Sequence, residues 1–297
     1  MSTPFEAPTQ SRPLAMTLML SASALVAVTT LFAKALGTDA LGPALHPIQV
    51  THGRFLFAFL SLTLAATVLR PRIDRPHWRL HIARTSAGFL GVTLMFAAVA
   101  RIPMSDATAI TFLNPVFAMM LAIPLLGETV ERWRWSAAAI ALMGAVILLR
   151  PGPDSFRPDA LLALGSAVVM GLEVIFIKKL AGRERPFQVL LVNNAIGLCI
   201  ASAAVLPVWT PPTPAQWAAL AGLGAAMACA QTCYINAVAR ADASFVAPFA
   251  YSTLVFAALY DAAIFGTLPD WVSFLGAGVI LSGAAVLAWR EGRRVRA

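Results

Sequence analysis

The stretch Ala98-Val99-Ala100-Arg101 recurs 139 residues later as Ala237-Val238-Ala239-Arg240, and this recurrence decides the fold. With the same shift, residues 47–150 align on residues 186–289 without a gap, and 21 of the 104 aligned positions are identical. The stretch Val116-Phe117-Ala118 falls on Val255-Phe256-Ala257 in this alignment. The chain therefore consists of two related halves.

The composition is that of a membrane protein. Of the 297 residues, 59% are hydrophobic and 12% are charged, and the mean hydropathy is +0.76. A soluble domain carries about 25% charged residues. The net charge of +8 does not indicate nucleic acid, because the basic residues occupy short loops between apolar runs instead of one water-facing surface.

A membrane-spanning helix needs about 20 apolar residues, and ten segments of suitable length and character can be found. The sequence predicts an all-α polytopic membrane protein of ten transmembrane helices, arranged as two inverted five-helix repeats. The predicted helices are 14–36, 46–69, 80–100, 104–126, 134–150, 159–180, 187–208, 215–236, 243–265 and 271–289.

Five helices per half is an odd number, so the second half must enter the membrane from the opposite side. The charges agree, because a basic run in the first half aligns on uncharged residues in the second. Arg70, Arg72, Arg75, Arg79 and Arg84 fall on Trp209, Pro211, Pro214, Ala218 and Leu223. Basic residues prefer the cytoplasmic side of a membrane. We therefore expect repeats at 14–150 and 159–289, with cytoplasmic tails at 1–13 and 290–297, in the cytoplasmic (inner) membrane.

Charged side chains inside a membrane are costly and are candidates for function. Three stand out here: Arg54, Glu173 and Asp261. Arg54 suits either a substrate carboxylate or a structural hydrogen bond to another helix. Glu173 suits substrate or proton binding, an ion pair with another helix, or snorkelling. Asp261 lies near a helix end, where simple solvation is favoured.

Uncharged polar residues in both halves extend the set of candidates. Helix–helix hydrogen bonding is an alternative role for each of them. Prolines at 115 and 248 remove helix hydrogen bonds and are predicted bending points. The spacing of His77 and His81 fits a metal, but exposure at the membrane interface is the favoured interpretation. The predicted substrate-binding residues are Arg54, Asn114, Glu173, Asn193, Gln231, Tyr234, Tyr251 and Ser252.

Several motifs resemble the drug/metabolite transporter superfamily, in its ten-helix EamA-type branch. They are Pro47 with Arg54-Phe55, the stretch Ala98 to Arg101, Asn114-Pro115 and Gly127-Glu128. The second half departs from the pattern, since Thr267 follows Gly266 where the family often has Glu. In size and layout the chain resembles the YddG-like amino-acid exporters. The resemblance implies a cavity lined by the first four helices of each half, with the fifth helices peripheral, and no metal or other cofactor.

The sequence therefore predicts a secondary transporter that exports small polar metabolites, with amino acids favoured, by alternating access. There is no glycine-rich phosphate loop followed by lysine, so ATP is not expected to drive it. Its expected partners are a small-molecule substrate and the lipid bilayer, and a weak homo-oligomer is left open. The alternatives are a carrier for nucleobases or drug-like cations, a passive channel, a lipid flippase or an intramembrane enzyme. The enzyme is disfavoured because no pair of catalytic groups recurs at matching depth.

Overall fold

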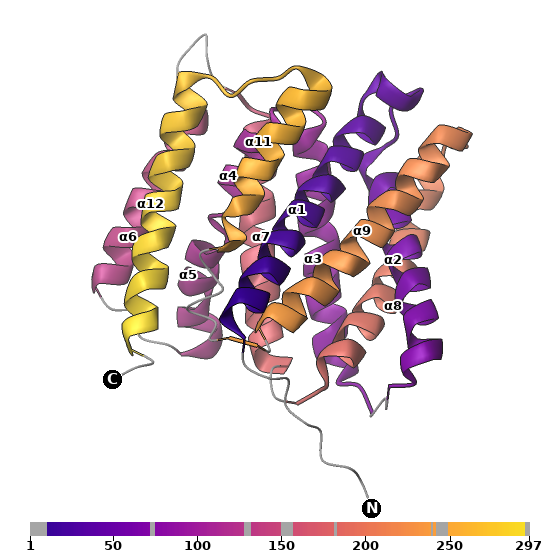
Figure 1. The fold of residues 1–297 in the computed structure, drawn as a ribbon, viewed down its shortest axis with the longest axis horizontal. Helices are drawn as coiled ribbons and strands as arrows, with labels where there is room; N and C mark the ends of the chain where they lie inside the picture. Colours follow the sequence, from indigo (N-terminus) through magenta and orange to yellow (C-terminus); the bar gives the residue numbers. More distant parts are fainter. Residues whose placement is uncertain are drawn as a thin grey trace, which may run out of the picture.

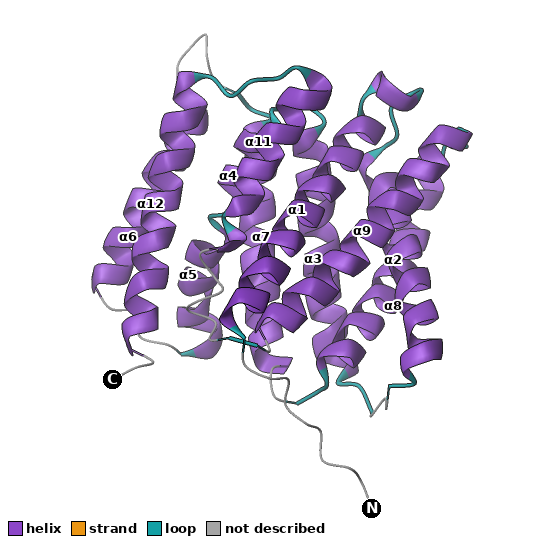
Figure 2. Cartoon of the chain, in the orientation of Figure 1, coloured by secondary structure: helices purple, strands orange, loops and turns teal. Residues whose placement is uncertain are grey.

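A computed structural model describes residues 11–71, 75–127, 132–149, 157–180, 183–238, 240–241 and 249–294. Within these ranges the regular structure is entirely helical (Figure 2). The helices are α1 (Arg12–Gly37), η1 (Asp39–Leu41), α2 (Pro47–Leu69), α3 (Trp78–Val99), α4 (Met104–Thr111), α5 (Asn114–Leu126), α6 (Arg132–Leu149), α7 (Ala160–Leu180), α8 (Pro186–Val205), η2 (Leu206–Val208), α9 (Pro214–Val238), α11 (Ser252–Phe265) and α12 (Trp271–Arg294).

Most helix ends agree with the predicted ends to within a few residues. The predicted helix 104–126 is instead two helices, because α4 ends at Thr111 and α5 begins at Asn114. Pro115 explains the break, since it has no N–H to donate to the preceding turn. The predicted helix 271–289 is longer than expected, because α12 continues to Arg294, and the cytoplasmic tail at 290–297 stays a prediction. Residues 243–248 of the ninth predicted helix, with Pro248, lie outside the described residues, as does Glu128.

The helices have the length and composition of membrane spans. In the described ranges, seven helical stretches are long and apolar enough to cross a bilayer, and three shorter apolar helices accompany them. The shorter ones are Trp135–Leu149, Ser252–Phe265 and Trp271–Gly283. The protein is therefore a multi-pass membrane protein, consistent with ten predicted spans.

The helices run side by side, and both chain termini lie at the same end of the bundle (Figure 1). We call this the terminal end and the opposite one the far end. The most extensive helix contacts pair α1 with α9, α3 with α7 and α6 with α12. The 139-residue shift aligns α1 with α7 and α3 with α9. The contact between α1 and α9 therefore corresponds to the contact between α7 and α3, with the two halves interchanged. Inverted repeats produce this relation, and the division into two repeats stays a prediction.

Helices α6 and α12 form a pair at one edge of the bundle (Figure 1). Gly144 lets their backbones approach, since a Cβ on it would lie 2.7 Å from the carbonyl oxygen of Gly276. Such small-residue contacts hold helices together where lipid provides no hydrophobic drive. The edge pair leaves the remaining helices to enclose the centre.

Candidate functional site

A cavity of about 740 Å³ lies among the central helices. Its lining comes from α1 to α4, the first residue of α5, α7 to α9 and α11, together with residues of the connections such as Phe112, Glu184 and Ala250. Within the described ranges, α6 and α12 contribute nothing to the lining. This arrangement agrees with the cavity that the family resemblance implied. Its size suits a small organic molecule.

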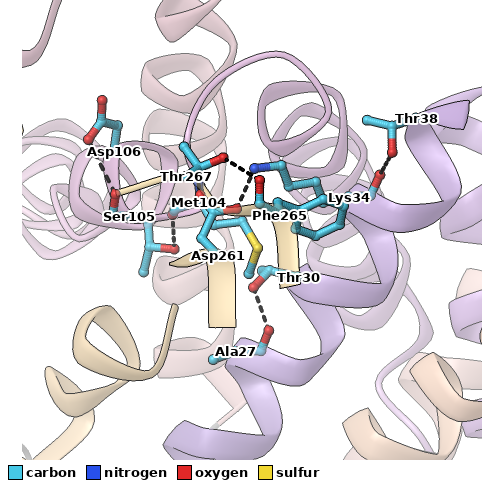
Figure 3. A network of polar contacts seen from close by, with 11 residues as sticks. Ala27, Thr30, Lys34, Thr38, Met104, Ser105, Asp106, Asp261, Phe265 and Thr267 are labelled. Carbon is cyan, nitrogen blue, oxygen red and sulfur yellow. Dashed lines mark hydrogen bonds and ion pairs between the residues drawn. The ribbon is translucent and has the colours of Figure 1, made fainter. Parts of the chain in front are cut away.

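The cavity extends from the middle of the bundle to the terminal end, where Glu184 and Pro186 line it. Toward the far end the lining on α1 reaches Thr30, one turn before Lys34. Beyond that turn, Lys34 and Asp261 form an ion pair that ties α1 to α11 (Figure 3). The structure is therefore closed at its far end.

Two buried arginines meet the cavity from neighbouring helices. Arg54 on α2 is 6% exposed and Arg84 on α3 is 7% exposed, and both line the cavity. The Nε of Arg54, and the Nε and Nη1 of Arg84, are buried without a hydrogen-bond partner. Buried polar groups are almost always paired, and a guanidinium has five donors and no acceptor. The two guanidinium groups therefore have unmatched positive charge and spare donors, which suits an anion in the cavity that they line.

Glu173 lies beside the arginines. Its Oε1 is 3.5 Å from the Nε of Arg84, an ion-pair distance without hydrogen-bond geometry. It shares a helix face with Met170 and Ile177, three residues before and four after it, which both line the cavity. Its carboxyl packs against Gly88 of α3, where a Cβ would lie 3.0–3.1 Å from the carboxyl atoms. A side chain at position 88 would therefore displace the carboxylate.

The predicted site residues divide into two groups. Asn114, Gln231 and Tyr234 line the cavity together with Arg54, and the Oε1 of Gln231 is buried without a partner. The cavity lining does not include Glu173, although it lies beside Arg84. The structure thus brings four predicted residues into the lining and a fifth next to it.

The other three predicted residues make contacts between or within helices. The Thr85 hydroxyl donates to the Oδ1 of Asn193 at 3.0 Å, which links α3 to α8. Tyr251 packs edge-on against Phe112, with ring centroids 5.2 Å apart. The Ser252 hydroxyl donates to the carbonyl of Phe249 at 2.7 Å. These contacts favour the structural alternative for Asn193 and Ser252.

Two buried basic residues, Arg84 and Lys34, were not among the predicted site residues. Arg84 belongs to α3 and is 7% exposed, and Lys34 belongs to α1 and is 9% exposed. A signal for Lys34 was present, because the 139-residue shift places Lys34 on Glu173. Both helices that open a half therefore carry a charge at the same repeat position.

The interpretation of Asp261 as a solvated residue was wrong. Asp261 is 1% exposed, pairs with Lys34 and accepts a hydrogen bond from the backbone N–H of Met104 at 2.8 Å. Figure 3 shows these groups meeting from α1, α4 and α11. The Nζ of Lys34 also lies 4.6 Å from the centroid of the Phe265 ring. Asp261 is only four residues from the end of α11, so its burial comes from the packing of the neighbouring helices and not from its position along the chain.

A second polar cluster lies at the terminal end. Glu184 accepts hydrogen bonds from the backbone N–H of His77 at 2.7 Å and from Gln188 at 2.8 Å, and contacts both histidine rings at 2.9 Å. His81 is 0% exposed, so its expected interfacial exposure was wrong, whereas the His77 side chain is 46% exposed. Burial alone would raise the pKa of Glu184, but the hydrogen bonds from His77, His81 and Gln188 lower it to about 2.

Comparison with known proteins agrees with this architecture. The EamA-like transporter family matches twice along the chain, at residues 13–150 and 158–289. The chain belongs to this family. It is therefore a transporter and not an enzyme, and the resemblance read from the motifs is confirmed.

The EamA relatives carry different molecules. A riboflavin transporter of Rhizobium johnstonii is 35% identical over 74% of this chain and 72% of its own length. An S-adenosylmethionine uptake transporter of Rickettsia bellii is 28% identical over 84% of this chain and 87% of its own. A pseudopaline exporter of Pseudomonas aeruginosa is 24% identical over 69% and 72%. A protein of known crystal structure shares the fold, with a TM-score of 0.63 and 21% identity over 97% of this chain and 100% of that protein.

Proposed function

We propose that this EamA-family protein is a carrier for a small metabolite that bears a carboxylate, with amino acids and their derivatives as the first class. It works by alternating access in the cytoplasmic membrane, with export as the proposed direction and both termini in the cytoplasm. The observation that carries the proposal is the pair of buried arginines that line the cavity and have donors without a partner. The terminal end, where the cavity reaches the surface loops, is then the cytoplasmic end.

Arginine suits this role because its planar fork can bind a carboxylate with two parallel hydrogen bonds. Arg54 and Arg84 approach from different helices, so an anion between them would contact both α2 and α3. Such a contact would form only in the state that exposes the cavity, which is what a carrier needs to couple binding to a change of shape. The closed far end and the cavity at the terminal end support one state of that cycle.

The relatives support a substrate of this size but divide on its chemistry. S-adenosylmethionine contains a methionine carboxylate, whereas riboflavin has none. A carboxylate carrier should therefore distinguish molecules by this group and not by bulk. Relatives named for uptake and for export both occur, so direction has to be measured by itself.

The test is counterflow of radiolabelled methionine, S-adenosylmethionine and riboflavin in proteoliposomes that contain the purified chain. Methioninamide, which lacks the carboxylate, competes in parallel. We expect saturable counterflow of a carboxylate-bearing molecule and competition by methionine at least tenfold stronger than by methioninamide. Linear, non-saturating flux would indicate a channel instead.

Arg54→Lys and Arg84→Lys keep the charge but lose the fork, so each should raise the KM for the acid several-fold while the protein stays folded. Arg101→Lys is the matched control. Arg101 pairs with Asp159 at 3.6 Å, and both side chains are 48% exposed, so its replacement should leave KM unchanged. If riboflavin alone is transported and both cavity variants behave like the parent, the carboxylate proposal is wrong and a neutral aromatic substrate replaces it.

A further inference from the structure

The centre of the cavity carries an unequal number of positive and negative charges. Arg54 and Arg84 provide two positive charges and Glu173 provides one negative charge. Arg54 and Arg84 line the same cavity, and Glu173 lies 3.5 Å from Arg84, so we treat the three groups as one unit of charge. Glu184 at the terminal end is held by its own cluster with His77, His81 and Gln188.

We propose that Glu173 sets the charge of the substrate group that the two arginines accept, so that the cavity takes one carboxylate and rejects a second. This inference rests on the carboxylate-carrier function proposed above. Glu173 neutralises one of the two guanidinium charges and leaves the other for the ligand. The site is balanced when a single negative charge enters.

The geometry keeps Glu173 in this role. Its side chain is 20% exposed and sits between the cavity face of α7 and Gly88 of α3, beside Arg84. At 3.5 Å from Arg84 without a hydrogen bond, the carboxylate supplies charge without occupying a donor of Arg84. A ligand can therefore bind both arginines without removing Glu173.

A second carboxylate would meet no unmatched positive charge in this unit. Burying an uncompensated charge is strongly unfavourable in a low-dielectric interior. Lys34 lies outside the cavity lining, at the far end, and is engaged there by Asp261. Selectivity against dianions therefore follows from the charge count and does not require a steric block.

The experiment measures binding of matched acids to the purified full-length protein by isothermal titration calorimetry. Succinamate and succinate differ by one carboxylate, and so do glutaramate and glutarate, and none of the four has an ammonium group. We expect the parent protein to prefer the amide member of each pair. Glu173→Gln should shift the Kd ratio by about tenfold or more toward succinate and glutarate, equivalent to about 1.4 kcal/mol. Glu173→Asp keeps the charge and should keep the preference of the parent.

Asp159→Asn is the control for the loss of any acidic charge. Asp159 is 48% exposed and outside the cavity lining, so its neutralisation should leave both ratios unchanged. A purely structural role for Glu173 would change stability and all affinities together, without reversing the preference within a pair.

The double variant Glu173→Gln/Arg84→Gln keeps the charge rule testable if Glu173→Gln fails to fold. It removes both partners of the ion pair, which costs far less stability than leaving one buried charge alone. Its remaining positive charge is that of Arg54, so it should again prefer the singly charged acids. A preference for dianions in the double variant, or unchanged ratios in Glu173→Gln, would overturn the inference alone. If methionine and methioninamide bind the parent equally well, the carboxylate-carrier function fails, and the inference fails with it.

Discussion

Lys34 of α1 and Asp261 of α11 form a buried ion pair at the far end of the bundle, although 227 residues separate them in the sequence. The pair lies one turn beyond Thr30, where the cavity lining on α1 ends (Figure 3). Asp261 also holds the first residue of α4 through the N–H of Met104. One carboxylate thus joins three helices where the cavity is closed.

Removing one partner of this pair should be much more damaging than removing both. Asp261→Asn or Lys34→Met leaves a buried polar or charged group unmatched, a loss of about 3–5 kcal/mol for typical buried pairs. The double variant Lys34→Met/Asp261→Asn should recover most of that loss. Thermal unfolding of the four proteins in detergent measures the coupling. Equal losses in the single and double variants would show that the two residues do not interact.

Gly88→Ala should impair binding more than folding. The added Cβ would lie 3.0–3.1 Å from the carboxyl atoms of Glu173 and would push them away from Arg84. We expect weaker substrate affinity and a stability loss of about 1–3 kcal/mol, as for other overpacked sites. Gly278→Ala is the matched control, because nothing lies within 4 Å of its Cβ position. An affinity of Gly88→Ala equal to that of the control would place Glu173 outside the binding site.

The Glu184 cluster should contribute stability that is lost in acid. The folded-state pKa of about 2 lies below the ordinary value of 4.5, so the contribution is present above the ordinary pKa and is lost as pH falls through this window. Glu184→Gln removes the titrating group. Between about pH 6 and about pH 3 its melting temperature should therefore fall less than that of the parent. Parallel curves for the two proteins would contradict the role of this carboxylate.

Thr85→Val tests the structural role of Asn193. The substitution removes the 3.0 Å hydrogen bond between α3 and α8 and leaves Asn193 in place. Hydrogen bonds between membrane helices contribute about 0.6 kcal/mol on average, so the melting temperature should fall slightly while KM stays that of the parent. A changed KM with unchanged stability would return Asn193 to the substrate site.

The proposed orientation predicts which residues a membrane-impermeant thiol reagent can reach. In a background without Cys199, Cys229 and Cys233, we expect Arg183→Cys to be labelled from the cytoplasm and Pro211→Cys from outside. Both positions are exposed, and α8 separates them, because Arg183 precedes that helix and Pro211 follows it and η2. Labelling of both from one side would contradict the inverted arrangement of the two halves.

The sequence by itself determined the class of protein and the position of most helices. Long apolar runs can be stable only in a bilayer, and the spacing of Pro and Gly residues marks their ends, so local composition is sufficient for this part. The break at Asn114-Pro115 is an exception. The apolar segment 104–126 has the length of one membrane helix, so its hydropathy does not show that α4 and α5 are separate, although the missing N–H of Pro115 is visible in the sequence.

Only the tertiary structure decided which charges are buried and with whom. In the sequence Arg84 follows a run of arginines and Lys34 lies near the end of a helix, so both look like surface residues. Asp261 looks solvated because it lies near the end of α11. Their environment depends on neighbouring helices that are distant in sequence: Glu173 on α7 for Arg84, and α1, α4 and α11 together for Lys34 and Asp261. The free energy of a buried charge depends on the groups that surround it in three dimensions. These groups belong to helices that are distant in the sequence, so they are known only from the packed structure.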